Sequence, residues 1–210
     1  MKISIFGATG GIGKHLLQLA LNDNHEVKVY VRNKNKLTLS HKNLSITEGN
    51  LNEFSKIIDF VKGSEIVLST LGSSMDKSYN TFPILEGHIN IMKAMEINNI
   101  KRFLTIGTPS IRFEKDKKTS YTTIGPFIGK SLYPHAIKET VSVGNVIKQS
   151  QLNWTVVRFM MPVDEETAEA KVSFGEDKLG WRISRKNIAK YILKEALENK
   201  HIRSMPIIGS

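Results

Sequence analysis

Four of the seven residues from Gly7 to Gly13 (GATGGIG) are glycines, close to the start of the chain. The stretch follows an apolar run at 2–6 (KISIF) and precedes apolar residues at helical spacing, so we expect it to connect a strand to a helix. A helix N-terminus presents unpaired amide groups, which a phosphate reaches where no Cβ intervenes. The spacing G-x-x-G-x-x-G therefore favours a dinucleotide-binding loop over the alternative, a plain tight turn. The residues expected to contact the dinucleotide here are Gly7, Thr9, Gly10, Gly11, Ile12 and Gly13.

A second candidate group follows the run 26–31 (EVKVYV), which reads as the second strand. Folds that select NAD place Asp or Glu at the end of this strand, where the carboxylate accepts a hydrogen bond from a ribose hydroxyl. This chain has Arg32 there, with Lys34 and Lys36 close behind. A guanidinium can bind a 2′-phosphate through two hydrogen bonds, whereas a carboxylate would repel it. The pattern favours NADP, as NADPH, over NAD; a basic surface loop is the alternative.

Short strand-like runs alternate with helical patterns along the chain. We expect strands at 2–6, 26–31, 44–47, 65–72, 102–107 and 154–160. We expect helices at 12–21, from a cap at Asn52 to 61, at 80–99, at 135–149 and from a cap at Ser184 to about 199. This alternation predicts an α/β fold with a doubly wound parallel sheet of Rossmann type, in one domain over 1–210. The irregular segments 108–134 and 160–183 are expected to form a small substrate side, toward the C-terminus.

Several stretches carry a resemblance to a known family. The chain is similar to the atypical short-chain dehydrogenase/reductase group, particularly to NmrA-like NAD(P)H-binding proteins and flavin/biliverdin reductases. The stretches that carry this likeness are IFGATGGIGKHLLQLAL (5–21), VYVRN (29–33), VLSTLG (67–72), IKRFLTIGT (100–108), SQLNWTVVRF (150–159) and RISRKNIAKYIL (182–193).

The resemblance implies that the loops after the third, fourth and fifth strands complete the cofactor cleft. It places Asn50 and Leu51 beside the adenine, Leu71 and Gly72 along the dinucleotide, and Thr108 near the nicotinamide. The family often has Asp where Asn50 stands. Asn keeps a carbonyl that accepts hydrogen bonds and adds a donor.

The Tyr-x-x-x-Lys pair that short-chain dehydrogenases use for proton transfer has no usable counterpart. Only Tyr30 has a lysine at the required spacing, and that match lies beside the expected adenosine site. Thr108 has a hydroxyl at the position of the family's serine, so it is the one candidate catalytic residue; it could orient a substrate carbonyl or merely cap the loop. Lys138 and His135 are expected on a solvated helix face, since the family's frequent lysine aligns nearer Thr140.

These features favour an NADPH-dependent reductase that transfers hydride to a small planar or carbonyl acceptor, such as a flavin or quinone. The alternative is a non-catalytic NADP-binding redox sensor of the NmrA type, and a nucleotide-sugar epimerase is a weaker third. The acceptor is expected beyond Thr108, in a pocket of apolar and aromatic side chains, although these could equally be ordinary core. The pocket candidates are Phe127, Phe159, Met160, Met161, Phe174 and Trp181.

Composition argues against several other classes of protein. The chain has 210 residues and no cysteine, and its six histidines are scattered without metal-ligand spacing, so we expect no disulfide and no metal site. Lys and Arg number 30 against 20 Asp and Glu, but no basic stripe with interleaved aromatics indicates nucleic acid. No apolar run is long enough for a membrane span, and the interrupted N-terminal apolar run argues against a signal peptide. We expect a cytoplasmic protein with a small-molecule partner and no nucleic-acid or membrane partner; nothing indicates an oligomeric state.

Overall fold

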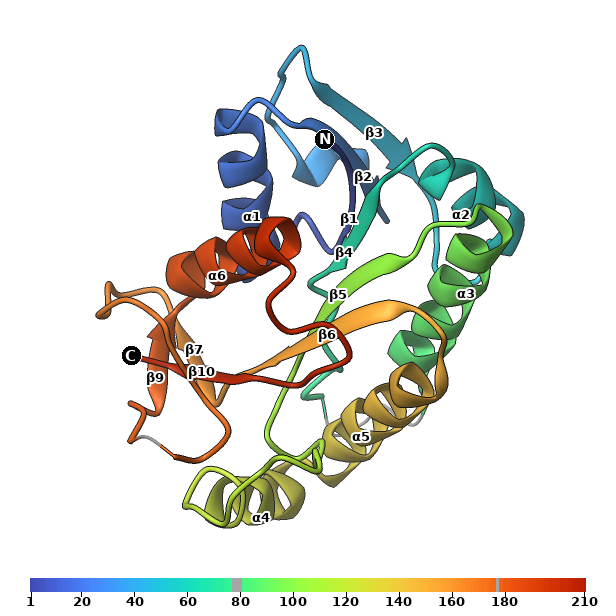
Figure 1. Cartoon of the computed structure of the whole chain (residues 1–210). Helices are drawn as coiled ribbons and strands as arrows, with labels where there is room; N and C mark the ends of the chain where they lie inside the picture. The colour runs from blue at the N-terminus through green and yellow to red at the C-terminus, as the bar shows by residue number, and fades with distance from the viewer. Residues whose placement is uncertain (77–80, 177) are drawn as a thin grey trace.

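A computed structural model describes residues 1–76, 81–176 and 178–210. Its main sheet has eight strands in the order β3-β2-β1-β4-β5-β6-β10-β8 (Figure 1). The strands are β1 (Lys2–Phe6), β2 (Glu26–Val31), β3 (Leu44–Glu48), β4 (Ile66–Ser69), β5 (Arg102–Gly107), β6 (Asn153–Arg158), β8 (Lys171–Ser173) and β10 (Ile207–Gly209). A separate pair of parallel strands joins β7 (Met161–Val163) to β9 (Arg182–Ser184).

Strands β1 to β6 run parallel, which confirms the expected doubly wound sheet. All four residues of β4 are buried, as expected for a strand that is covered on both faces. The strand order reverses direction between β1 and β4, so the loops after β1 and β4 diverge and leave a crevice at the carboxyl ends of the strands. The glycine loop lies at this crevice.

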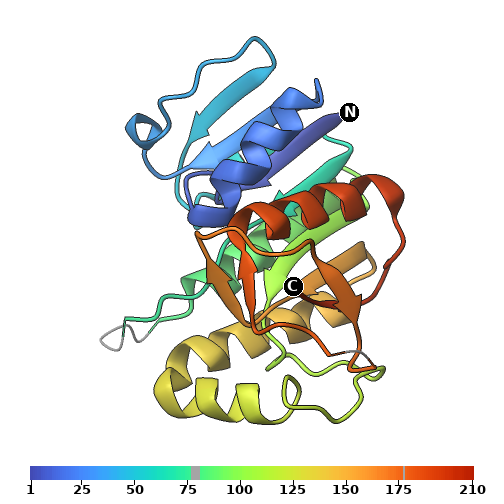
Figure 2. The same cartoon turned by 90° about the vertical axis from the view of Figure 1, so that its left-hand side faces the viewer.

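Helices cover both faces of the sheet. On one face, α1 (Gly11–Asn22) packs against α6 (Arg185–Glu198); the blue and red helices lie together in front of the sheet in Figure 2. Residues such as Leu16 and Ile188 form the core on this side. The other face carries α2 (Phe54–Val61), α3 (Pro83–Ile97) and α5 (Pro134–Gln149), with residues such as Ile57, Ile91 and Val143 in the core.

The two segments expected to be irregular contain regular structure. Segment 108–134 includes the helix α4 (Ile124–Leu132), although it contains Gly125, Pro126 and Gly129. Pro126 falls in the first turn, where its missing amide has no intrahelical acceptor to lose. Segment 160–183 contains β7, β8 and the start of β9, and β8 pairs antiparallel with β10, so the sheet is mostly rather than wholly parallel.

Several element ends differ from the expectations. Helix α2 begins at Phe54 after Glu53, one residue later than a cap at Asn52 would place it. Helix α3 begins at Pro83, and Asn80, the first residue expected in this helix, lies outside the described residues. Strand β10 has no counterpart among the expectations because only three residues pair there, directly after Pro206.

Candidate functional site

Two glycines of the first turn let α1 pack against the end of β1. Gly7 has a φ of 83°, and a Cβ on it would lie 2.7 Å from the Oγ1 atom of Thr70 in the turn after β4. A Cβ on Gly13 would overlap the carbonyl oxygen of Gly7. Thr70 donates its hydroxyl to that same carbonyl oxygen at 3.1 Å. The turn itself therefore requires glycine at Gly7 and Gly13. For these two residues the alternative of a plain tight turn is sufficient.

Gly10 and the first turn of α1 present a different surface. Gly10 is exposed and caps the helix without any side chain, while its amide donates to the Gly7 carbonyl oxygen at 2.9 Å. The amides of Gly11 and Ile12 come next, and a helix offers its first-turn amides no internal acceptor. This arrangement leaves a ready position for an anionic group, as a dinucleotide's diphosphate requires.

A cavity of about 680 Å³ opens beside this turn, at the carboxyl ends of β1, β2 and β4. We call it the dinucleotide cleft. Its lining includes eight of the residues expected to contact cofactor: Gly7, Thr9, Gly10, Arg32, Asn50, Leu51, Leu71 and Gly72. The structure thus brings together residues from the loops after β1, β2, β3 and β4, whereas Thr108 after β5, which the resemblance also placed in the cofactor cleft, lines the neighbouring pocket. Gly11 and Gly13 line neither this cleft nor the neighbouring pocket.

Arg32 is exposed at the end of β2 and lines the cleft. Within the described part of the chain, no carboxylate pairs with its guanidinium. Lys34 and Lys36 follow in a short 3-10 turn, Lys34–Lys36. The guanidinium is therefore available to a phosphate at this end of the cleft.

Tyr30 positions the loop that carries Asn50. Its hydroxyl donates to the Asn50 carbonyl oxygen at 3.0 Å, and the Asn50 amide donates to Glu53 at 2.5 Å. Burial, reinforced by the nearby Glu53 charge, raises the pKa of Tyr30 to about 12, so the phenol stays protonated near neutral pH. The sequence indicated Tyr30 only as a rejected catalytic match, and the structure shows it as part of the cleft floor.

A second cavity, of about 210 Å³, adjoins the cleft and shares Leu71, Gly72 and Ile84 with it. We call it the acceptor pocket. Thr108 and Ile12 line it, as do Phe159 and Met160 from the end of β6. Most of the lining is apolar.

Three residues with hydroxyl groups line the acceptor pocket: Ser73 after β4, Thr108 after β5 and Thr140 in α5. The Oγ1 atom of Thr108 is buried and has no hydrogen-bond partner among the described residues. Ser73 and Thr140 face each other with their hydroxyl oxygens 3.2 Å apart. Thr140, near which the resemblance places the family's lysine, has a neutral hydroxyl instead of a cation.

His88 is the only titratable residue that lines the acceptor pocket among the described residues. Its Nδ1 lies 2.8 Å from the carbonyl oxygen of Ile84, which can only accept, so Nδ1 carries the hydrogen. Its Nε2 then accepts from Thr105 Oγ1 at 2.9 Å. Burial lowers the pKa of His88 to about 4, so the ring is neutral near pH 7 and is no proton donor. No motif in the sequence singled out His88, although its helical spacing from Ile84 and Ile91 indicates burial.

Lys138 and His135 lie away from both cavities. Lys138 is exposed, with its ammonium 5.7 Å from the centre of the Phe82 ring, and His135 lies 3.0 Å from the carbonyl oxygen of Thr81. This outcome agrees with the expected solvated helix face.

Two of the six apolar and aromatic residues predicted for the acceptor pocket line it. Phe159 and Met160 line the pocket. Phe127 is 76% exposed on α4 and Met161 is 51% exposed, so neither faces it. Phe174 packs near Phe113 against the core on the side of α2, α3 and α5, and Trp181 packs near Tyr121 in a separate small cluster.

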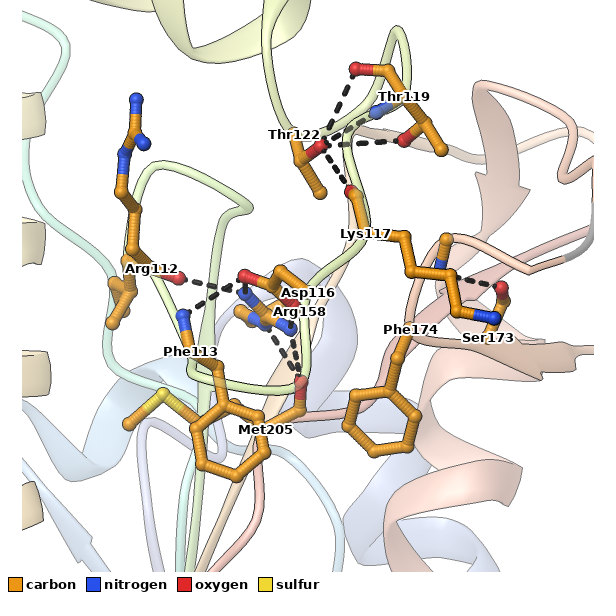
Figure 3. Close-up of polar contacts among 12 residues, drawn as sticks. Arg112, Phe113, Asp116, Lys117, Thr119, Thr122, Arg158, Ser173, Phe174 and Met205 are labelled. Carbon is orange, nitrogen blue, oxygen red and sulfur yellow. Dashed lines mark hydrogen bonds and ion pairs between the residues drawn. The ribbon is translucent and has the colours of Figure 1, made fainter.

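A buried ion pair fixes the segment that follows β5 (Figure 3). The Arg158 side chain is fully buried at the end of β6, and its guanidinium donates to both carboxylate oxygens of Asp116, at 2.5 and 2.7 Å. It also donates to the carbonyl oxygens of Ile111 and Met205. The Thr122 hydroxyl faces Thr119 and Lys117 in the same view. These contacts join the segment after β5 to the end of β6 and to Met205, just before β10.

The described residues contain no cluster of side chains suited to a metal ion. They also contain no helix that is both long and apolar enough to cross a bilayer.

Comparison with known proteins adds a family and a fold. A family model described as NAD(P)H-binding matches residues 7–199. Phenylcoumaran benzylic ether reductase PT1 of Pinus taeda is 28% identical over 113 residues, which are 49% of this chain and 34% of that protein. The uncharacterized protein YwnB of Bacillus subtilis is 24% identical over 74% of this chain and 70% of its own length. The chain thus spans about a third of the length of the plant reductases that it matches.

Two solved structures share the fold over the full length of this chain. A short-chain dehydrogenase/reductase of Veillonella parvula, in complex with NADP, has a TM-score of 0.82 at 19% identity and is covered to 94%. The anaerobillin reductase ChuY of Escherichia coli has a TM-score of 0.81 at 17% identity and is covered to 97%. At these identities the likeness establishes the Rossmann-type fold.

Proposed function

Because this chain belongs to the NAD(P)H-binding family, we propose that it is a reductase that transfers hydride from NADPH to a small planar or carbonyl acceptor. One observation carries the proposal. The dinucleotide cleft continues into an apolar pocket, so an acceptor bound in that pocket would meet the nicotinamide end of the cofactor. The names of the relatives agree in class, since both the pine protein and ChuY are called reductases.

NADPH is the proposed cofactor because of the charge at the end of β2. Arg32 would bind the 2′-phosphate, with Lys34 and Lys36 adding positive field. The glycine loop would bind the diphosphate, and Asn50 and Leu51 would contact the adenine. The NADP complex of the Veillonella parvula protein is consistent with this choice.

NADPH supplies the hydride when bound, and the residues of the pocket determine which acceptor can use it. The Thr108 hydroxyl would donate to an acceptor oxygen, because it is buried and lacks another partner among the described residues. His88 is neutral and already donates its one hydrogen to a carbonyl, so it supplies no proton. The acceptor therefore takes its proton from water. Conjugated acceptors such as flavins and quinones suit this chemistry better than simple aldehydes.

The same lack of a proton donor favours a second candidate, a non-catalytic NADP sensor of the NmrA type. Such a protein would bind NADPH without turning it over and would signal through a partner. The proposal places either activity in the cytoplasm, with no nucleic-acid or membrane partner.

NADPH oxidation with a panel of flavins, quinones and aldehydes tests the proposal. We expect turnover with at least one flavin or quinone and slower turnover with aldehydes. Tight NADPH binding in calorimetry without turnover on any acceptor would refute the reductase and favour the sensor.

A further inference from the structure

The two cavities share Leu71, Gly72 and Ile84, and the turn from Gly10 to Ile12 runs from one cavity to the other. Gly10 lines the dinucleotide cleft and Ile12 lines the acceptor pocket. A dinucleotide with its adenosine in the cleft and its nicotinamide at the pocket would place its diphosphate at this helix N-terminus, beside Gly11. The sequence offers no cation in this turn before Lys14.

A cation from the other end of the chain lies against this turn. Arg185 is the first residue of α6, directly after the cap Ser184, whose hydroxyl accepts from the Asn187 amide at 3.1 Å. The Cδ and Nε atoms of Arg185 lie 2.7 Å from the position that a Cβ on Gly11 would take. Gly11 thus lacks a side chain where the arginine side chain passes, and the guanidinium carbon lies only 3.7 Å from the same position.

The present partner of this guanidinium is a weak one. Its Nη1 atom lies 2.7 Å from Oδ1 of Asp164, whose side chain is 84% exposed. Ion pairs this exposed contribute little to stability, because water screens them. A diphosphate carries more charge than one carboxylate and can accept two hydrogen bonds from a guanidinium. An exchange of partners is therefore favourable once a dinucleotide is present.

We propose that Arg185 binds the diphosphate of the cofactor and that Asp164 holds the guanidinium in place while no nucleotide is bound. The proposal rests on dinucleotide binding in the proposed function but not on turnover. It assigns Gly11 a role distinct from that of Gly10: Gly11 admits the arginine, and Gly10 leaves room for the phosphate.

The neighbouring ion pairs show why Arg185 differs from the cations beside it. Arg182 pairs with Glu165 and Lys186 pairs with Glu166, so three basic residues face the acidic run 164–166. Only Arg185 lies against the glycine loop. If all three pairs merely joined the segment after β7 to the start of α6, removing any of them would affect stability alone.

Calorimetry on the purified full chain tests the proposal with four ligands: NADPH, NADH, ADP-ribose and adenosine 2′-monophosphate. We expect Arg185→Gln to weaken the first three by roughly tenfold or more, because each contains the diphosphate. Adenosine 2′-monophosphate lacks the diphosphate, so its affinity should not change. Lys186→Gln is the matched control, since it removes one positive charge from the next residue of the helix, and it should leave all four affinities nearly unchanged.

Removing the charge of Asp164, the present partner of Arg185, should not weaken dinucleotide binding. Asp164→Asn should leave dinucleotide affinity unchanged or raise it a few-fold, because it removes a competing negative charge. Unchanged ADP-ribose affinity in Arg185→Gln would overturn the proposal, as would an Asp164→Asn variant that loses affinity as Arg185→Gln does. A wild-type protein that binds none of the dinucleotides would overturn it together with the proposed function, whereas binding without turnover would refute the reductase alone.

Discussion

The four glycines of the first turn serve different purposes. Gly7 and Gly13 allow the backbone to turn and pack, and Gly11 leaves room for the Arg185 side chain. Gly10 lines the cleft, and a Cβ on it would lie close to the Gly7 carbonyl oxygen alone. The sequence predicted the loop from spacing but could not separate these purposes. The contact between Gly11 and Arg185 joins residues far apart in the chain, and no local pattern encodes such a contact.

Gly10→Val should abolish dinucleotide binding and leave the fold largely intact. A branched side chain would fill the phosphate position, while the residue itself is exposed. Calorimetry with NADPH on the folded variant measures the effect. Gly13→Val is the informative comparison, because its Cβ would overlap the Gly7 carbonyl oxygen and the variant should unfold. Unchanged NADPH affinity in Gly10→Val would remove the diphosphate assignment.

Thr108→Ala should lower kcat/KM for the acceptor by about fivefold, the value of one neutral hydrogen bond, and barely change NADPH affinity. The reason is that Thr108 lines the acceptor pocket rather than the dinucleotide cleft. Thr108→Ser should restore most of the activity. Steady-state kinetics with an acceptor from the panel measures this, and unaltered kinetics in the alanine variant would return Thr108 to a loop-capping role.

His88 should make the fold sensitive to acid. Its folded pKa of about 4 lies below the ordinary value of 6.5, so the unfolded chain binds a proton more readily between these pH values. The free energy of unfolding should therefore fall as the pH drops below 6.5, by about 2 kcal/mol between pH 7 and pH 5 from this group. Urea unfolding at both pH values measures it. In His88→Gln, whose amide does not titrate here, a pH dependence as large as in wild type would contradict the assignment.

At the scale of elements, alternating patterns predicted strands β1 to β6 and, apart from α4, the helices between them, because both faces of the sheet are covered. The C-terminal part was harder to predict. Strands β7 to β10 have three residues each, too few to produce a period. Helix α4, earlier in the chain, was missed because it contains two glycines and a proline. The contacts of the segment 111–116 with β6 depend on Arg158, which a hydrophobic strand pattern does not single out.

Arg158→Met should destabilise the protein by about 3–5 kcal/mol, because it leaves the largely buried Asp116 carboxylate without its cation. Replacing both partners, as in Arg158→Met with Asp116→Leu, should cost less than the single change. Urea unfolding of the three proteins measures the difference. Equal losses in Arg158→Met and in the surface variant Arg182→Gln, whose ion pair is exposed, would contradict a structural role for the buried pair.

At the scale of the whole molecule, the net charge of +10 suits an anionic cofactor, and two arginines from opposite ends of the chain lie along its proposed path. Family and fold followed from motifs distributed over nearly the whole sequence. The acceptor did not, because its pocket is lined from six separate segments whose side chains meet only in the folded chain. The cofactor is therefore the part of the proposed function that the sequence specifies best.

Steady-state oxidation of NADPH and NADH, with one quinone or flavin from the panel, tests the central claim most directly. The wild-type protein should use NADPH with a kcat/KM roughly tenfold or more above that for NADH, and Arg32→Ala should remove most of this preference by weakening NADPH alone. Lys34 and Lys36 still attract the 2′-phosphate in the variant, so a small preference for NADPH should remain. Equal use of both cofactors by the wild type, or an equal loss of both in Arg32→Ala, would contradict the claim that this arginine selects NADPH.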